Sequence, residues 1–205
     1  RPSFPVNVHE VRPGGVALDG DGYEVRTFAT EHRNASSMGY ALVEDDRRGR
    51  FDREKAEELG VPVGPKFGRL HNGEAVELDD GTVIEPEQVV GDPRPGRRFV
   101  YTGDSRPVDA AVEAAAEPDL LIHDATFGAE WAERARQTGH STAREAAEIA
   151  NRAGATRLAL THISSRYAGD AGPIEREAKE AFDGETAFVP DDGRTFEIPY
   201  PDAEE

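Results

Sequence analysis

The chain contains no cysteine, one methionine, one tryptophan and no long apolar run. Without cysteine, disulfides and thiolate metal ligands are excluded, so any metal site must use histidine, carboxylates and water. A membrane span needs about 18 or more consecutive apolar residues, and none is present. No signal-like leader is evident either. A length of 205 residues fits one domain, or one domain with a subdomain, and we expect a cytoplasmic protein.

Lysine is also scarce, since it supplies three of the 24 basic residues and arginine the other 21, against 41 acidic residues and a net charge of −17. Such a surface suits cytoplasm of very high salt, where the screening length falls to ~3 Å at 1 M and self-repulsion is weak. We interpret it as a halophile adaptation, with an ordinary acidic cytoplasmic protein as the alternative. RNA binding in molar salt would rest on arginine forks, base stacking and metal contacts.

Composition and periodicity divide the chain into a main domain, 1–43 with 98–205, and an inserted arm, 44–97. The arm is rich in glycine, proline and charge, and Asp79-Asp80-Gly81 predicts a hairpin turn in it. From Arg98 onward strands and helices alternate, which is typical of an α/β fold. The predicted strands lie at 6–11, 23–28, 39–43, 98–102 and from 120, and near 158, 187 and 196. The predicted helices lie near 52–59, 107–116, 129–137, 142–153 and 173–182.

Polar residues follow three apolar strands at the point where each ends. Asp104 comes after one strand, His123-Asp124 close the next, and His162 follows Leu158-Ala159-Leu160. Ligands gather at the carboxyl ends of strands in α/β sheets, so these residues predict one shared site. Taken singly, Asp104 could equally cap the following helix and His162 could be a structural histidine.

Three further residues are candidates for the same site. His32 ends an earlier strand, and His140 precedes a predicted helix whose free amides favour anions. Arg166, four residues after His162, could clamp a phosphate with its planar fork or simply form a surface ion pair. His123, Asp124 and His140 are candidates for proton transfer or phosphate contact.

The combination of these segments resembles ribonuclease Z, the tRNA 3′-end endonuclease family of the metallo-β-lactamase superfamily. The resemblance spans about residues 23 to 199 and rests on Glu31-His32 with Gly39-Tyr40, the Gly60 to Gly68 segment with Gly64-Pro65, Thr102-Gly103-Asp104, His123-Asp124-Ala125-Thr126-Phe127, Gly139-His140-Ser141-Thr142 and Thr161-His162-Ile163-Ser164-Ser165-Arg166-Tyr167.

The resemblance implies a metallo-β-lactamase-like αββα sandwich, present here in part, and a site for two zinc ions. His32 would bind one zinc, His162 the other, and Asp104 would bridge both. A metal-held hydroxide would attack the phosphodiester of precursor tRNA. His140 would assist proton transfer or the leaving group, with Asp124 orienting it and His123 beside it.

The same resemblance implies that the arm, 44–97, is an exosite that grips the tRNA elbow. Gly64, Pro65 and Lys66 in the arm and Arg166 in the main domain would contact the substrate. Homodimers are expected, in which the arm of one subunit serves the site of the other.

Two departures from the family pattern matter. The motif His-Glu-Ala-Thr reads His123-Asp124-Ala125-Thr126 here, and the motif His-x-His-x-Asp-His is absent. Without that second motif each of two zinc ions would have two protein ligands, fewer than the three that a catalytic zinc normally has. We therefore expect a truncated chain, inactive alone, whose missing ligands lie upstream or on a separate segment. The alternatives are a non-catalytic RNA-binding relic and a small-phosphodiester metallohydrolase of the same superfamily.

Overall fold

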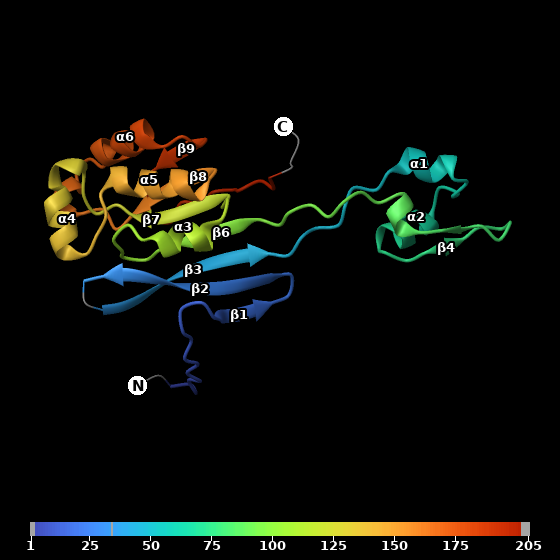
Figure 1. Ribbon diagram of the computed structural model, residues 1–205, viewed down its shortest axis with the longest axis horizontal. Helices are drawn as coiled ribbons and strands as arrows, with labels where there is room; N and C mark the ends of the chain where they lie inside the picture. The colour runs from blue at the N-terminus through green and yellow to red at the C-terminus, as the bar shows by residue number, and fades with distance from the viewer. Residues whose placement is uncertain (1–2, 34, 202–205) are drawn as a thin grey trace. The chain divides into compact units, whose positions relative to one another are not determined.

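A computed structural model describes residues 3–33 and 35–201, which pack as two compact units (Figure 1). The first unit contains the described residues up to Glu44 and from Arg97 to Pro201, and the second contains 45–96. These limits lie within one residue of those predicted for the arm. Residues 1–2 and 202–205, which end the predicted main domain, lie outside the described residues.

A seven-stranded sheet forms the first unit. Its spatial order is β1 (Val16–Gly20), β2 (Tyr23–His32), β3 (Ala35–Glu44), β6 (Arg98–Tyr101), β7 (Leu120–Asp124), β8 (Arg157–Thr161) and β9 (Thr186–Phe188). The pairs from β1 to β6 are antiparallel, and those from β6 to β9 are parallel. The alternation of strand and helix after Arg98 explains the parallel half, because parallel neighbours need a crossover.

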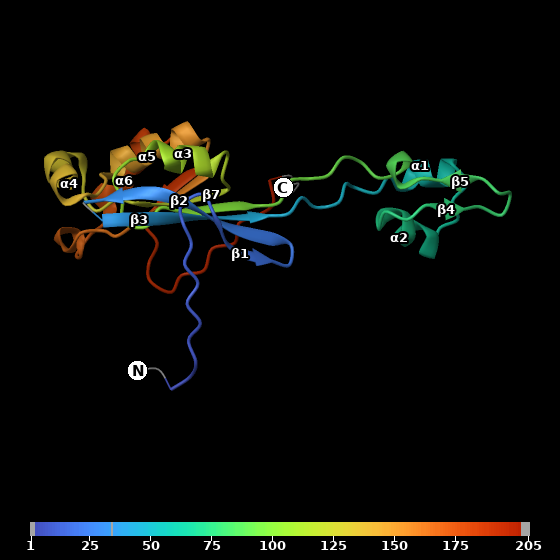
Figure 2. The ribbon, with the colours of Figure 1, turned by 60° about the horizontal axis from the view of Figure 1, so that its bottom comes forward.

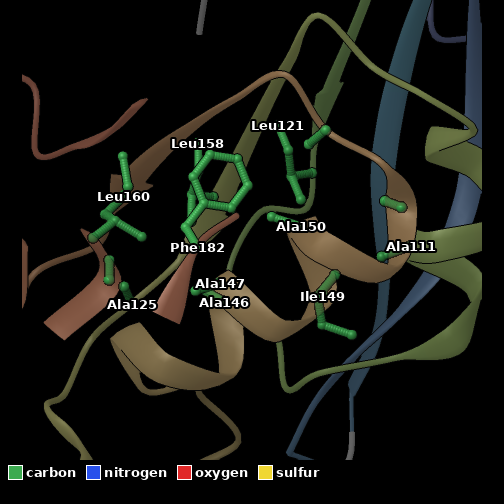
Figure 3. Close-up of a cluster of buried hydrophobic side chains, with 14 of the residues drawn as sticks. Ala111, Leu121, Ala125, Ala146, Ala147, Ile149, Ala150, Leu158, Leu160 and Phe182 are labelled. Atoms are coloured by element: carbon green, nitrogen blue, oxygen red, sulfur yellow. The ribbon is translucent and has the colours of Figure 1, made fainter. Parts of the chain in front are cut away.

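The crossover helices lie on one side of this sheet, as Figure 2 shows for α3 (Asp109–Ala115), α5 (Ala143–Ala153) and α6 (Gly172–Ala181). Thr142 caps α5 through a capping box with Glu145. The alanines of α5 at helical spacing, Ala143, Ala146, Ala147, Ala150 and Ala153, are buried and let the helix approach the sheet closely. In Figure 3, Ala150 lies next to Leu121, and Ala146 and Ala147 lie on the side of Leu158 and Phe182, all in one hydrophobic cluster. The predicted helix at 129–137 is a 3-10 turn, η2 (Ala129–Trp131), followed by α4 (Ala132–Thr138).

The opposite face of the sheet is also apolar, and among the described residues no helix covers it. Tyr40 and Tyr101 are partners across β3 and β6, and both are exposed. The described chain thus supplies one sheet and one helical layer of the four-layer sandwich that the family resemblance implies.

The second unit has a small core of its own. It consists of α1 (Arg53–Glu58), α2 (Pro65–His71), a hairpin of β4 (Val76–Glu77) and β5 (Val83–Ile84), and the 3-10 turn η1 (Pro86–Gln88). Its buried side chains are Ala56, Val61, Leu70, Val76, Ile84 and Val89. The predicted hairpin around Asp79-Asp80-Gly81 is therefore present.

Two local predictions differ from the structure, and two elements, β1 and α2, were not predicted. No strand forms over 6–11, where Val6 and Val8 are exposed, because apolar alternation makes a strand only when a partner strand is at hand. Phe196 lies in irregular chain that packs on Phe188 instead of in a strand. Helix α2 was not expected, since glycine and proline dominate the residues before it. None of the helices in the described part of the chain has the length and apolarity that crossing a bilayer requires.

Candidate active site

Sheet topology brings four strand ends to one edge. Strands β6, β7 and β8 run parallel, so the residues that follow them, including Asp104 and His162, lie at the same edge as Asp124. Strand β3 lies between β2 and β6 and is antiparallel to both, so β2 runs in the same direction as β6. The end of β2 therefore brings His32 to the same edge.

His162 has a left-handed backbone, with φ +59°, which is unfavourable for a residue with a side chain by about 1–3 kcal/mol. Its Nδ1 lies 2.7 Å from Thr126 Oγ1, whose own proton goes to Asp124 Oδ1 at 2.8 Å. The threonine oxygen must therefore accept from His162 Nδ1–H. In the neutral ring the lone pair is then on Nε2, which lies 3.4 Å from Asp104 Oδ2.

His140 is held by the buried carboxylate of Asp124, with Nδ1 2.7 Å from Oδ2. The same carboxylate also accepts hydrogen bonds from the backbone of Ser105 and from Thr126, at 2.8–3.1 Å. With its oxygens occupied in this way, Asp124 positions His140 and is a poor candidate for a metal ligand. Because an ionised carboxylate only accepts, His140 donates from Nδ1, and the neutral ring then has its lone pair on Nε2.

His32 completes the group. Its Nδ1 lies 3.1 Å from the carbonyl oxygen of Gly139, which can only accept, so His32 also keeps a free Nε2. Gly139 ends α4 with φ +79°, and a Cβ there would lie 2.3 Å from Arg33 N. Only glycine allows the chain to pass His32 this closely. The carbonyl of Gly139 and the hydroxyl of Thr126 are supporting groups that sequence reasoning missed, although both lie inside the quoted motifs.

The three histidines all use Nδ1 in these hydrogen bonds, and their rings lie next to one another. The His140 ring centroid lies 4.7 Å from that of His32 and 4.8 Å from that of His162, which it stacks on. A carboxylate oxygen of Asp124 and ring nitrogens of His140 and His162 lie within 4.8 Å of one another, although hydrogen bonds already occupy the Asp124 oxygens. A neutral histidine that donates from Nδ1 can bind a metal ion through Nε2. The half-exposed carboxylate of Asp104 lies beside His162, and His32, Asp104 and His162 supply the imidazole and carboxylate donors that a divalent metal ion binds.

The helix-capping alternative for Asp104 is wrong, because the residue at the N-cap position of α3 is Val108. Arg166 lies in the 3-10 turn η3 (Ser165–Tyr167), which begins three residues after His162. Its guanidinium lies over the rings of Phe127 and Trp131 and forms no ion pair among those described. Phe127 in turn presents an edge contact to His140, with ring centroids 6.4 Å apart.

His123 does not join this group. Its ring is fully buried on the helical side of β7, Nδ1 lies 2.8 Å from the carbonyl oxygen of Asp124, and Nε2 has no partner among the described residues. Burial holds the pKa of His123 below its ordinary value, so the ring is neutral at pH 7. A buried, neutral ring in the core has no access to a substrate.

The candidate arm residues belong to the second unit. Gly64 precedes α2 with φ +154°, a conformation that residues with a side chain rarely adopt, and Pro65 is the first residue of the helix. Lys66 Nζ donates to the carbonyl of Glu77 at 2.7 Å, which ties α2 to the hairpin. These contacts describe the arm itself.

Comparisons with known proteins agree with the fold. Residues 81–163 match the model of a beta-lactamase superfamily domain. Two solved structures share the fold: human tRNase Z, short form (TM-score 0.53, 24% identity, 90% of this chain and 46% of that one), and the metallo-beta-lactamase fold protein YhfI from Bacillus subtilis (TM-score 0.54, 21% identity, 86% and 50%).

Relatives found by sequence have much higher identity to the chain than these two structures have. Ribonuclease Z of Natronomonas pharaonis is 69% identical over 201 residues, covering 98% of this chain and 65% of that protein. Ribonuclease Z of Haloferax volcanii is 67% identical over 204 residues, covering 100% and 64%. Ribonuclease Z of Gemmatimonas aurantiaca is 50% identical over 198 residues, covering 97% and 62%. By sequence the chain is similar over nearly its whole length to proteins named ribonuclease Z, and it spans a little less than two thirds of the length of these relatives.

Proposed function

We propose that the protein to which this sequence belongs is a zinc-dependent endoribonuclease that removes the 3′ trailer from precursor tRNA. The observation that carries the proposal is the convergence of His32, Asp104, His140 and His162 at one sheet edge, with three histidines in the metal-binding tautomer. Relatives named ribonuclease Z, up to 69% identical, support the choice of reaction.

His32, Asp104 and His162 would hold the metal ions, and Asp104 would be the ligand that two of them share. A zinc ion bound there supplies a Lewis acid and lowers the pKa of water toward neutrality. The ligands of the missing His-x-His-x-Asp-His motif would come from another segment. Two zinc ions per complete site remain our expectation.

The protein's own acid–base group would be His140. Asp124 fixes its Nδ1–H and stabilises the imidazolium once Nε2 takes up a proton. His140 can then deliver that proton to the leaving ribose oxygen. Arg166 would neutralise a phosphate of the substrate, and the arm with Gly64, Pro65 and Lys66 would grip the tRNA body. We further propose that the protein is cytoplasmic and that it forms a homodimer. Light scattering on the native protein would test the dimer.

The test uses the native polypeptide that contains this sequence, in high salt. It is incubated with 5′-labelled precursor tRNA carrying a short trailer, and the products are sized. We expect one cut at the 3′ end of the tRNA body, lost in EDTA and restored by zinc. RNA binding without cleavage in the zinc-loaded protein would instead favour the non-catalytic relic.

A second substrate distinguishes the proposed function from the remaining alternative, a small-phosphodiester metallohydrolase. If RNA is the substrate, precursor tRNA should inhibit hydrolysis of a small chromogenic phosphodiester by occupying the same site. Hydrolysis that precursor tRNA leaves unchanged would favour the small-phosphodiester hydrolase.

A further inference from the structure

An exposed aromatic group stands beside the candidate active site. Trp131, the only tryptophan in the chain, is 43% exposed and is not part of either hydrophobic core. The guanidinium carbon of Arg166 lies 5.2 Å from the centre of its ring and 5.7 Å from that of Phe127. Phe127 contacts His140, so the aromatic and guanidinium surfaces continue from the histidine cluster outward.

The segment that carries Trp131 is held firmly. Gly128 N donates to the Tyr167 hydroxyl at 3.0 Å, and that hydroxyl donates to Glu130 at 2.8 Å. One residue further, Ala129 N donates to Glu177 at 2.8 Å. The turn is therefore tied both to η3, which carries Arg166, and to α6. A group that binds Trp131 meets a surface that is already in place, so little ordering entropy opposes binding.

A tryptophan face next to a guanidinium matches a nucleotide. An unpaired base can stack on the indole, while the arginine fork takes up the attached phosphate. Stacking also depends less on salt than long-range attraction does, which suits RNA binding by a chain with net charge −17. A cation–π pair with no ligand would be a surface contact of small effect, and it would not need an exposed indole beside the site.

We propose that Trp131 and Arg166 form a binding site for one unpaired nucleotide of the RNA substrate, next to the scissile phosphate. This inference rests on the proposed function and adds a specificity element to it. Trp131 is a binding residue that takes no part in bond breaking. Its loss should weaken substrate binding and leave the chemical step of bound substrate largely intact.

The single tryptophan makes binding directly visible. In EDTA, where no cleavage is expected, the native polypeptide is titrated with precursor tRNA and its tryptophan fluorescence is followed; a tryptophan elsewhere in that polypeptide would first be replaced by phenylalanine. We expect saturable quenching. Labelled RNA then measures Kd for Trp131→Leu, Trp131→Phe and Arg166→Lys, with Arg152→Lys as control, because Arg152 is an exposed arginine paired with Asp109 and remote from these rings.

We expect Trp131→Leu to weaken binding about 5- to 100-fold, Trp131→Phe to recover most of it, and Arg152→Lys to have no effect. In cleavage assays KM should rise and kcat change little. Precursors with one abasic nucleotide on either side of the cleavage point locate the base, because the Trp131→Leu penalty should vanish for one of them.

Normal cleavage of tRNA with a Trp131→Leu effect below 2-fold on both Kd and KM would overturn the nucleotide site and leave the proposed function standing. A penalty that persists in every abasic precursor would also overturn it. Quenching by RNA together with no cleavage by the zinc-loaded protein would do the opposite, since it retains the site and rejects the reaction.

Discussion

His140 Nδ1 lies 2.7 Å from Oδ2 of Asp124, and the carboxylate is shielded from water. If Asp124 fixes the tautomer of His140, Asp124→Asn should lower kcat/KM for precursor tRNA by about 10²- to 10⁴-fold, the range of a general acid–base contribution. Metal content and circular dichroism should stay close to the parent values. Asp124→Glu, which restores the acid of the family motif, should lose far less. Equal activity in Asp124→Asn and the parent would remove this role.

Asp104 is expected to be a metal ligand, since its carboxylate lies beside His162 Nε2. Asp104→Ala should lower the zinc retained after dialysis, measured by atomic mass spectrometry, and abolish turnover. Asp109→Ala is the matched control, because Asp109 is an exposed aspartate paired only with Arg152 among the described residues. Zinc content that does not change in Asp104→Ala would exclude the bridging role.

Gly139 has a double constraint, a positive φ and the close approach of Arg33. Gly139→Ala should therefore reduce the free energy of unfolding by about 1–3 kcal/mol and displace the carbonyl that His32 donates to. Urea unfolding and zinc content measure the two effects. Gly169→Ala is the control, because no atom lies within 4 Å of a Cβ there, and it should stay within about 0.5 kcal/mol. A Gly139→Ala variant as stable as this control would contradict the packing argument.

His123 predicts a dependence of stability on pH. Its pKa is lowered in the folded state by burial, so below the unfolded value of about 6.5 the unfolded chain binds more protons. Stability should then fall as pH drops, by at most about 1.4 kcal/mol per pH unit from this group, until the folded pKa is reached.

The effect is isolated by comparing His123→Leu with the parent between pH 7.5 and 5 in urea. The variant should lose less stability over this interval, whatever its stability at pH 7.5. His9→Leu, at an exposed histidine, should follow the parent. Identical pH slopes for His123→Leu and the parent would show that His123 does not titrate on unfolding.

The arm can be removed at a hydrogen-bonded junction. Glu44 N donates to Arg97 O at 3.0 Å, and Val43 pairs with Arg98 across β3 and β6. Replacing 45–96 by Asn-Gly should close these strands with a two-residue turn. If the arm grips tRNA, cleavage of precursor tRNA should fall steeply while hydrolysis of a small phosphodiester persists. Equal loss on both substrates would mean that the arm serves the fold.

The convergence of the site was predictable because it depends on strand ends. Each of Asp104, Asp124 and His162 follows an apolar run, and alternation with helices implies parallel strands whose ends meet. The position of His32 could not be predicted in this way, since only the observed sheet order shows that β2 and β6 run in the same direction. The choice between His123 and Asp124 was not predictable, because neighbouring strand residues point to opposite faces and the sequence does not say which one reaches the cleft.

The remaining errors arise where packing decides the conformation. Apolar alternation at 6–11 resembled a strand, yet Val6 and Val8 have no strand beside them. In the arm, Pro65 starts α2 because proline fits the first turn of a helix, and the glycine before it was interpreted only as a break. The partners of Arg166 were also hidden, since Trp131 lies 35 positions earlier and meets it only through the η2 turn.

The left-handed backbone of His162 has an evolutionary consequence. Glycine or asparagine would adopt that φ with less strain, so folding alone would favour either of them at this position. If His162 binds a metal ion as proposed, the imidazole would be retained there for what its Nε2 binds, at a cost in the stability of the fold.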